Sequence, residues 1–448
     1  MNRRNDTARS VALHSLLRMK NNDGYSNIVL DNALKTSNLN VKDKSLASAI
    51  FYGVLEKQIT LDYFINQSLK NPERKLDPVA KEALRCGVYQ ILFLDRVPNS
   101  AAVNETVNAV KLIGKPGLSG LVNGVLRGLL RKKDDILIPD DNSLSALSIR
   151  YSLPQELIEF WIKSYGERFT MKLLNSLSKK PELYVRINNV KTEGNTLLSL
   201  LDKDGVKLKL LSELPGAGVF ENCSASADIT KLAAFNKGLF HVQDLSAQYV
   251  CKLLDPMPGD IVCDCCAAPG GKTFTIAQQL GNGRIYSMDL HESRVKLIQM
   301  GATRLGLENI ECRVNDAVKG FGNMPAVDKM LCDVPCSGFG VIRRKPEIRY
   351  KSLNTLKKLP QLQYAILCKA AEKVKPGGML IYSTCTLNPA ENGNVAEQFL
   401  KENNGYEPMN IDLGLKRSID EPEYMLTMTP FAGASDGFFA AAFRKRNK

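Results

Sequence analysis

The sequence predicts an α/β fold: a doubly wound parallel sheet that follows an all-helical bundle and a small mixed α/β region. Strand-like and helix-like segments alternate from about residue 236 onward, which is the pattern of a parallel sheet covered by helices. A glycine turn joins the first of these strands to the next helix. Before about residue 133, apolar residues keep helical spacing and show no strand alternation, so helices alone are expected there.

The N-terminal region is predicted to be a basic helical bundle. Apolar residues such as Leu61, Phe64 and Ile65 recur at helical spacing, and Lys115-Pro116-Gly117 breaks the pattern. Residues 1–133 hold 21 Lys and Arg against 11 Asp and Glu, in a chain whose net charge is +13. This asymmetry favours a region that binds a polyanion. The alternative is a basic surface that is merely solvated.

Changes in composition divide the rest of the chain. Residues 134–150 are acidic, contain Pro and Ser, and lack long periodicity, so a linker is expected. Residues 151–235 combine helical and strand-like runs, which predicts a small α/β region. The sheet domain then spans 236–448. We expect its strands at 261–263, 284–288, 310–314, 329–332 and 379–383, with helices at 272–280, 292–305 and 354–374.

Membrane and secreted proteins do not fit the composition. No run of about eighteen apolar residues occurs, so no spanning helix is expected. The N-terminal residues include basic side chains but no apolar core followed by a small-residue cleavage site. We therefore expect a cytoplasmic protein with no membrane partner.

Cysteine and histidine spacing does not predict a metal site. The chain has 11 cysteines, which in a long cytosolic protein are more often catalytic or core residues than disulfides. His14, His241 and His291 have no partner at metal-ligand spacing. Cys263-Asp-Cys-Cys266 contains a C-x-x-C, but no second pair follows, so these are interpreted as core thiols.

The glycine turn after the first strand of the sheet predicts a cofactor site. Such a turn brings backbone N–H groups close to a ligand, and Asp289 ends the next strand, where a carboxylate meets ribose hydroxyls. A phosphate-binding P-loop would need glycine at position 266, and the dinucleotide pattern G-x-G-x-x-G is absent. A nucleoside cofactor fits better, and S-adenosylmethionine is the commonest one. The residues expected to line its site are Cys266, Ala267, Ala268, Pro269, Gly270, Gly271, Lys272 and Asp289.

Two cysteines follow consecutive strands of the predicted sheet. Cys336 comes after strand 329–332, and Cys385 after strand 379–383. Consecutive βα units are usually neighbours, about 4.8 Å apart, and ligands bind at the carboxyl ends of such strands. The sequence therefore predicts two thiols that face one pocket beside the cofactor turn.

A pair of thiols in this position suits methylation of cytosine at carbon 5. A thiolate that adds to carbon 6 makes carbon 5 nucleophilic enough to attack a sulfonium methyl group. Asp333 is placed to stabilise the charge that develops near N3 of the ring. A second polar group, here Cys336, could assist the loss of the carbon 5 proton and the release of the enzyme. The alternative is that one or both thiols pack inertly.

These motifs give the chain a close resemblance to the RsmB (Fmu/Sun) type of bacterial 16S ribosomal RNA cytosine-5 methyltransferase, over nearly its whole length. The resemblance is carried by Cys266–Thr273, by Asp333-Val-Pro-Cys-Ser-Gly338 with Gly340-Val-Ile-Arg-Arg344, and by Ser383-Thr-Cys-Thr386 with Glu391-Asn392. The helical region is similar to the NusB-like RNA-binding bundle of this subgroup. Small departures occur at Thr386, where Ser is common, and in the segment Ala434-Ser-Asp-Gly437.

The resemblance implies roles for individual residues. Cys385 is the expected nucleophile and Cys336 the residue that helps to release the product. Asp289 is expected to hold the ribose of S-adenosylmethionine, Asp316 to lie by the adenine, and Asp333 to lie near the methyl donor and the target base. Lys272 is expected to point into the same pocket.

The expected substrate is 16S ribosomal RNA, free or within a partly assembled small subunit. Two alternatives stay open. The first is an enzyme that methylates transfer RNA, since phosphate contacts from a basic bundle position an RNA without specifying its sequence. The second is a non-catalytic RNA-binding factor, as the NusB-like region alone would suggest.

Overall fold

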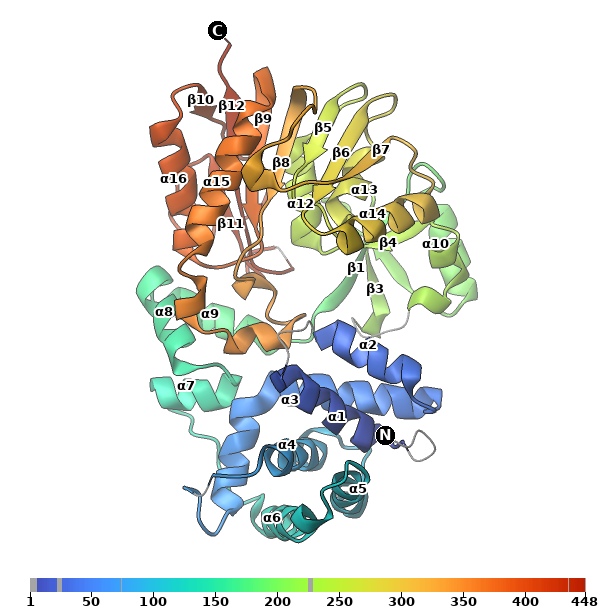
Figure 1. The fold of residues 1–448 in the computed structure, drawn as a ribbon, viewed down its shortest axis with the longest axis vertical. Helices are drawn as coiled ribbons and strands as arrows, with labels where there is room; N and C mark the ends of the chain where they lie inside the picture. The colour runs from blue at the N-terminus through green and yellow to red at the C-terminus, as the bar shows by residue number, and fades with distance from the viewer. Residues whose placement is uncertain (1–5, 22–25, 74, 225–228, 434, 448) are drawn as a thin grey trace. The chain divides into compact units, whose positions relative to one another are not determined.

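The computed structural model describes residues 6–21, 26–73, 75–224, 229–433 and 435–447 (Figure 1). The chain forms two compact units. The helical unit comprises residues 1–163 and 345–351, and the sheet unit comprises residues 164–344 and 352–448. The domain boundaries that composition suggests stay predictions.

The helical unit is built from helices alone among its described residues, as the sequence predicts. Polar caps begin several of them: the Asn40 side chain accepts a hydrogen bond from the Asp43 amide at 2.9 Å, and Asp77 accepts one from the Val79 amide at 2.7 Å. The helices are α1 Ala8–Asn21, α2 Ser26–Thr36, α3 Val41–Ser68, α4 Pro78–Phe93, α5 Asn99–Leu112, α6 Ser119–Lys132, α7 Leu144–Tyr151 and α8 Gln155–Tyr165, which extends to the first residues of the sheet unit.

Helix α7 occupies the second half of the stretch that we expected to be a linker. Ser143 caps it by accepting a hydrogen bond from the Ala146 amide at 3.2 Å, and Ala146 and Leu147 are buried. Eight residues are too few to show a helical period in the sequence, which is why the pattern did not indicate a helix.

A distant segment of the chain completes the helical unit. Residues 345–351 include the 3₁₀ helix Pro346–Tyr350. The Ser26 hydroxyl donates to the Glu347 carboxylate at 2.9 Å, and the Arg349 guanidinium donates to the Tyr151 carbonyl at 3.1 Å. Arg349 is among the largest fully buried side chains of the chain, so this segment is part of the interior of the unit.

The sheet unit begins with a small antiparallel sheet in the order β2-β3-β1-β4. Its elements are α9 Glu167–Leu177, β1 Glu182–Ile187, α10 Gly194–Lys203, β2 Leu208–Leu210, β3 Ala217–Ser224, α11 Ala233–Asn236 and β4 Phe240–Val242. The strand-like runs at Leu183–Ile187 and 207–211 and the helical run at 194–203 predict β1, β2 and α10, but the sequence misses β3 and β4. Strand β4 has only three residues, too few for a visible alternation.

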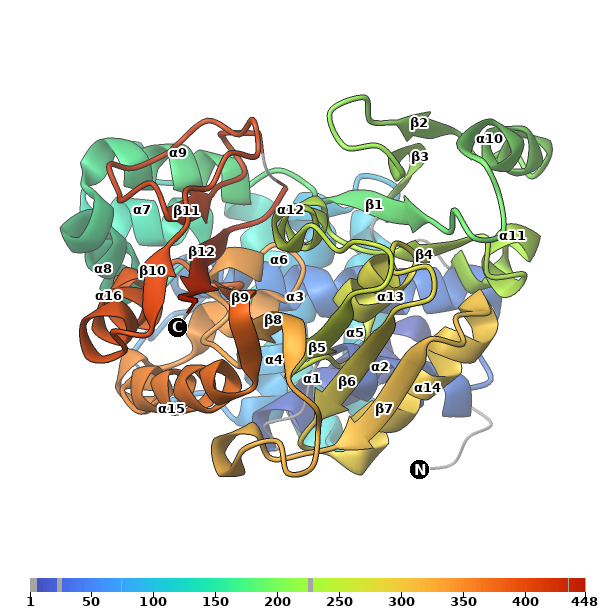
Figure 2. The same ribbon diagram turned by 90° about the horizontal axis from the view of Figure 1, so that it is seen from above.

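The larger sheet is the doubly wound sheet that the sequence predicts, in the order β10-β12-β9-β8-β5-β6-β7 with β11 paired to β12 (Figure 2). Strands β9, β8, β5, β6 and β7 are parallel, whereas β12 runs antiparallel to β9. Its strands are β5 Ile261–Asp264, β6 Arg284–Asp289, β7 Ile310–Val314, β8 Val327–Asp333, β9 Val374–Thr384, β10 Tyr406–Pro408, β11 Met425–Met428 and β12 Phe438–Lys445. Its helices are α12 Leu245–Leu254, α13 Gly271–Ala277, α14 Glu292–Leu305, α15 Leu359–Glu372 and α16 Gly393–Glu402.

Strand order fixes where a ligand can bind. Strand β5 is the first of these parallel strands along the chain. Strand β6 pairs with one side of it, and β8 pairs with the other. The crevice at such a reversal, outside the carboxyl ends of the strands, is where open α/β sheets bind ligands. The residues that follow β5 and β8 therefore lie beside one another at this crevice.

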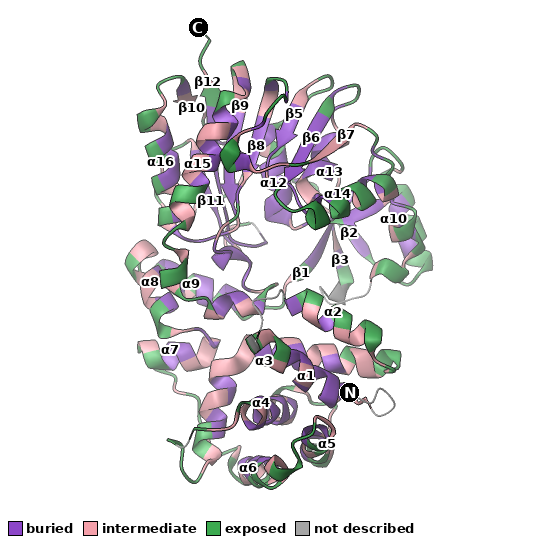
Figure 3. Cartoon of the chain, viewed as in Figure 1, coloured by how far each residue is buried: buried purple, intermediate pink, exposed green. Residues whose placement is uncertain are grey.

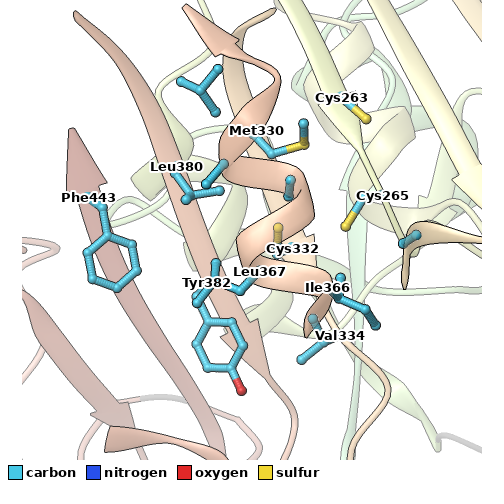
Figure 4. Close-up of a cluster of buried hydrophobic side chains, with 14 of the residues drawn as sticks. Cys263, Cys265, Met330, Cys332, Val334, Ile366, Leu367, Leu380, Tyr382 and Phe443 are labelled. Carbon is cyan, nitrogen blue, oxygen red and sulfur yellow. The ribbon is translucent and has the colours of Figure 1, made fainter. Parts of the chain in front are cut away.

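The core of the larger sheet packs against α15 and α16. Leu380 and Tyr382 of β9 belong to this core, with Leu367 of α15 and Phe399 of α16 (Figure 4). The sheet interior is buried on both sides (Figure 3), since Ile381, on the opposite face of β9, is also fully buried. Cys263 and Cys332 lie in this core, and burial raises the pKa of both thiols.

Two observations concern membranes and metals. None of the described helices is both long and apolar enough to cross a membrane. Among the described residues, no three or more His, Cys, Asp or Glu side chains are grouped so that they could hold a metal ion.

Truncating the core face of α15 should destabilise the sheet unit. Leu367 is fully buried, so Leu367→Ala removes apolar contacts and leaves a cavity, and we expect a loss of about 2–5 kcal/mol in the free energy of unfolding. The matched control is Leu362→Ala on the same helix, whose side chain is 37% exposed and should lose less than about 1 kcal/mol. Urea unfolding measures both, and equal losses would contradict the packing described.

Candidate functional site

The turn after β5 is built by backbone contacts that only glycine permits at its centre. Gly270 has φ +108°, and a Cβ atom there would lie 2.4 Å from the Phe274 ring. The Ala267 amide donates to the Met288 carbonyl at 2.8 Å, which ties the turn to β6. The turn is therefore held against the end of the neighbouring strand.

Asp289 supports the same turn from the end of β6. Its carboxylate accepts hydrogen bonds from the Ala268 amide at 3.2 Å and the His291 amide at 3.3 Å. Arg294 lies 3.4 Å from the carboxylate and also donates to the Ala268 carbonyl at 2.8 Å. Asp289 is nearly fully buried, so its position is fixed before any ligand arrives.

The third acidic residue predicted for the cofactor, Asp316, follows β7 at the same edge of the sheet. Its carboxylate accepts a hydrogen bond from the Val318 amide at 3.2 Å and lies 3.4 Å from the Lys319 ammonium. The preceding residue, Asn315, donates its amide hydrogen to the Asp289 carbonyl at 3.0 Å. Asp316 is thus placed at the rim of the crevice, two strands away from the turn.

Two buried polar atoms at this edge have no hydrogen-bond partner among the described residues: Asp264 Oδ1 at the end of β5 and Asn315 Nδ2 after β7. Burial raises the pKa of Asp264 to about 7, although the Thr273 hydroxyl donates to its other oxygen at 2.7 Å. An unpaired buried polar group is costly, so these atoms suit a ligand with its own donors and acceptors. The crevice therefore fits a polar nucleoside cofactor. The sequence analysis gave neither residue a role, although Asp264 lies within the segment Cys263–Cys266 and Asn315 directly precedes Asp316.

Cys336 and Cys385 lie together at the ends of β8 and β9. Their Sγ atoms are 3.3 Å apart. The pairing of the two strands places Asp333 opposite Ser383, and the Gly340 amide donates to the Cys385 carbonyl at 3.0 Å. Hydrogen bonding to Cys385, followed by burial, raises the pKa of the Cys336 thiol well above its ordinary value. Cys336 is therefore a protonated thiol at neutral pH.

An ion pair connects the cofactor turn to the strand that carries the thiols. Lys272 Nζ lies 2.6 Å from Asp333 Oδ2, and the Ser383 hydroxyl donates to Asp333 Oδ1 at 2.8 Å. Burial acts to lower the pKa of Lys272, but the Asp333 carboxylate outweighs it and the net shift is upward. The ammonium also lies 5.3 Å from the centre of the Phe438 ring. Lys272 is thus a fixed cation at the centre of the crevice.

A buried charge cluster holds the loop that follows Cys336. The Arg344 guanidinium contacts Asp436 at 2.5 Å and Asp244 at 2.8 Å, and Arg343 lies 3.0 Å from Asp436. Burial raises the pKa of Asp436 to about 6 despite these two cations. Beside this cluster, Gly340 approaches the backbone of Gly437 so closely that a Cβ atom would lie 1.8 Å from its carbonyl oxygen.

The sequence contained a signal for this cluster, because both segments were already part of the resemblance. It gave no reason to pair them, since about ninety residues separate them along the chain. Ala434, the first residue of the second segment, lies outside the described residues.

The predicted site residues thus fall into two groups. The structure brings Lys272, Asp333, Cys336 and Cys385 into one cluster. It places Asp289 against the turn that runs from Cys266 to Lys272, and Asp316 at the outer end of the same edge.

Family comparisons match both parts of the chain. Residues 251–444 match the family described as 16S rRNA methyltransferase RsmB/F, and residues 6–131 match the NusB family. The probable ribosomal RNA small subunit methyltransferase B of Bacillus subtilis strain 168 is 33% identical over 98% of this chain and 99% of its own length. The corresponding protein of Synechocystis strain PCC 6803 is 36% identical over 98% of this chain and 99% of its own length. The enzyme of Escherichia coli O1:K1 is 31% identical over 90% and 91%.

Solved structures show the same fold. The crystal structure of PH0851 superposes with a TM-score of 0.82 and 25% identity over 99% of this chain and 100% of its own. A methyltransferase homolog protein from Pyrococcus horikoshii gives a TM-score of 0.59 and 29% identity over 68% of this chain and 99% of its own. These similarities confirm the fold class that the sequence predicts.

The distance between the two sulfur atoms can be tested without substrate. A disulfide needs Sγ atoms about 2.05 Å apart, so a shift of about 1 Å would join Cys336 to Cys385. We expect mild oxidation with diamide to produce this disulfide, identified by mass spectrometry of non-reduced peptides. Cys336→Ser is the control and should abolish that peptide pair. Oxidation that leaves both thiols free would contradict the geometry.

Proposed function

Because the chain belongs to the RsmB/F family of 16S ribosomal RNA methyltransferases, we propose that it methylates carbon 5 of a cytosine in 16S ribosomal RNA with S-adenosylmethionine as the methyl donor. The observation that carries the carbon 5 chemistry is the pair of thiols 3.3 Å apart beside Asp333. One thiol serves as the nucleophile that this chemistry needs, and the second thiol beside it supplies a group that assists release.

Residues of the turn and the neighbouring strand ends hold the cofactor in this proposal. Asp289 accepts hydrogen bonds from the ribose hydroxyls, Asp316 lies toward the adenine, and the backbone from Cys266 to Gly271 faces the ligand. Lys272 and Asp333 stand where the methyl donor meets the base. When bound, S-adenosylmethionine supplies an electrophilic methyl group on a sulfonium.

Cys385 acts as the nucleophile. Its thiolate forms a bond to carbon 6 of the cytosine, and the electron pair of the 5,6 double bond becomes available at carbon 5. The addition leaves negative charge at N3, which takes a proton from water. Asp333 lies on the neighbouring strand, held by Lys272 and Ser383, and is rigidly placed to accept a hydrogen bond from the resulting N3–H.

Cys336 assists the return of the enzyme to its free state. After methylation, a water molecule takes the carbon 5 proton, the C5–H electron pair re-forms the 5,6 double bond, and the bond from carbon 6 to sulfur breaks so that Cys385 leaves as a thiolate. A thiol whose pKa is raised is a poor nucleophile at neutral pH but can hydrogen-bond to the departing sulfur. The raised pKa of Cys336 supports it as the residue that helps release, and the family resemblance supports Cys385 as the attacker.

The helical unit supplies the RNA-binding surface in this proposal. Its basic composition suits the phosphate backbone, whose contacts position an RNA without reading its sequence. The target base must leave its stack to reach a half-buried thiol. The relatives are named for the small ribosomal subunit, which favours 16S RNA over transfer RNA as substrate. A free RNA or a partly assembled subunit would serve, and a cytoplasmic location accords with either.

The cysteine roles predict opposite results for two substitutions. Incubation with unmodified 16S RNA and labelled cofactor should give 5-methylcytosine with the native chain and none with Cys385→Ala. Cys336→Ala should accumulate a covalent RNA–protein adduct that survives denaturing electrophoresis, because release is impaired. An adduct that persists in the Cys385→Ala, Cys336→Ala double variant would show that another residue attacks.

Removing the ribose-binding carboxylate should weaken the cofactor. We expect Asp289→Asn to lower the affinity for S-adenosylmethionine at least about tenfold, equivalent to about 1.4 kcal/mol, since an amide cannot accept both hydrogen bonds. Glu292→Gln, an exposed acidic position three residues later, is the control and should bind normally. Calorimetry measures both affinities, and equal values would remove Asp289 from the site.

A further inference from the structure

We propose that Glu391 is a positioning residue, whose buried carboxylate fixes the turn that carries Cys336 and places a negative charge beside that thiol. This inference rests on the proposed function, because it explains how two thiols in one pocket take different roles. Glu391 ends the short 3₁₀ helix Pro389–Glu391, six residues after Cys385, and is fully buried.

Three neutral donors hold the carboxylate of Glu391. Its Oε2 accepts hydrogen bonds from the Ser337 amide at 2.8 Å and from the Gln363 side-chain amide at 2.9 Å. Its Oε1 accepts one from the Asn388 side-chain amide at 2.7 Å. A buried charge is costly unless it is hydrogen-bonded, so the fold commits donors from three separate segments to this one group.

These donors lie on both sides of Cys336. Ser337 directly follows the cysteine. Gln363 also donates to the carbonyl of Pro335, which directly precedes it, at 3.0 Å. The residues before and after Cys336 are therefore both tied to Glu391, one through its own amide and the other through the Gln363 side chain.

Glu391 is equally linked to the segment that carries Cys385. The Tyr382 hydroxyl of β9 donates to the backbone carbonyl of Glu391 at 2.5 Å. The hydroxyls of Ser337 and Thr386, the residues after the two cysteines, lie 2.6 Å apart. The two cysteine turns are thus fixed to each other around the Glu391 carboxylate.

The contacts require that both terminal side-chain atoms of residue 391 accept hydrogen bonds. Each oxygen of the carboxylate faces at least one N–H donor, and a glutamine has one oxygen and one NH₂ group in their place. The NH₂ group of a glutamine would therefore face at least one of these N–H donors, and neither group could accept a hydrogen bond from the other. A carboxylate is the group that satisfies all three donors at once.

The charge of Glu391 acts in the same direction as its geometry. Hydrogen bonding to Cys385 and burial raise the pKa of Cys336, and the negative charge of Glu391 raises it further. Two tyrosines also interact with the Glu391 carboxylate: Tyr382, which interacts with Cys336 as well, and Tyr165. Burial raises the pKa of both hydroxyls, with Glu391 contributing. The cation of this site, Lys272, is paired with the Asp333 carboxylate, and a backbone hydrogen bond with Cys385 acts in the opposite direction, but the net shift of the Cys336 pKa is upward.

Alkylation of Cys336 tests the effect of the Glu391 charge on this thiol, and it needs neither RNA nor cofactor. In a Cys385→Ser background, the rate at which iodoacetamide modifies Cys336 is followed against pH by peptide mass spectrometry. Glu391→Gln should move the midpoint to lower pH and raise the rate at pH 8 about threefold to tenfold, because a nearby negative charge is lost. Glu397→Gln, which removes an exposed carboxylate from α16, is the matched control and should leave the profile unchanged.

Turnover provides the second measurement. With Cys385 intact, Glu391→Gln should lower kcat at least about tenfold while the affinity for S-adenosylmethionine, measured by calorimetry, stays within twofold. Glu391→Asp keeps the charge but shortens the reach. It should leave the alkylation profile of Cys336 in place and lower kcat, and it gives the test if Glu391→Gln does not fold.

Two results would overturn the proposal. One is an alkylation profile and a kcat in Glu391→Gln that match those of Glu397→Gln. The other is a Cys336 midpoint in Glu391→Asp that falls despite the retained charge. A chain that methylates no RNA at all would refute the proposed function, yet the alkylation experiment would still report on Glu391.

Discussion

The parallel pairing of β8 with β9 is the constraint on which the rest of the site depends. Its register sets Asp333 opposite Ser383, and the chain continues from these positions to Cys336 and Cys385. A slip of one residue would turn Asp333 to the opposite face, because side chains alternate along a strand. The buried core contacts of Leu380 and Tyr382 with α15 and α16 hold this register. The chemistry at the crevice is therefore determined by packing on the face of the sheet.

The ion pair between Lys272 and Asp333 makes the cofactor and base positions interdependent. Lys272 belongs to the turn after β5, and Asp333 ends β8, so one contact of 2.6 Å spans the reversal in strand order. With Ser383 on its other oxygen, Asp333 is oriented by groups from both sides. Rigid placement of this kind lowers the reorganisation that a reaction must pay for when charge develops. A change in the conformation of the turn after β5 would accordingly shift Asp333 and, through it, the positions of the two thiols.

Sequence reasoning predicted the elements whose signals are local. The parallel strands from β5 to β9 alternate with helices, and this order alone indicated that Cys336 and Cys385 are neighbours. Only the likeness of Gly437-Phe438-Phe439 to the closing strand of the family indicated β12, because Phe438–Phe443 is apolar on both faces and shows no alternation. Glu391 was noted only as part of a motif. One donor, Asn388, is only three residues away, but Ser337 and Gln363 are 54 and 28 residues away, and no spacing along a chain reveals a partnership with such distant segments.

The insertion of residues 345–351 into the helical unit has a consequence for biosynthesis. A ribosome makes the first 163 residues long before it reaches this segment, and domains generally fold as they emerge. Until then, the nascent helical unit lacks the Arg349 side chain that fills its interior and the Glu347 carboxylate that binds Ser26. It can reach its final packing only after the turn that carries Cys336 has been synthesised. The completed helical unit therefore exists only in chains that already contain one of the two thiols.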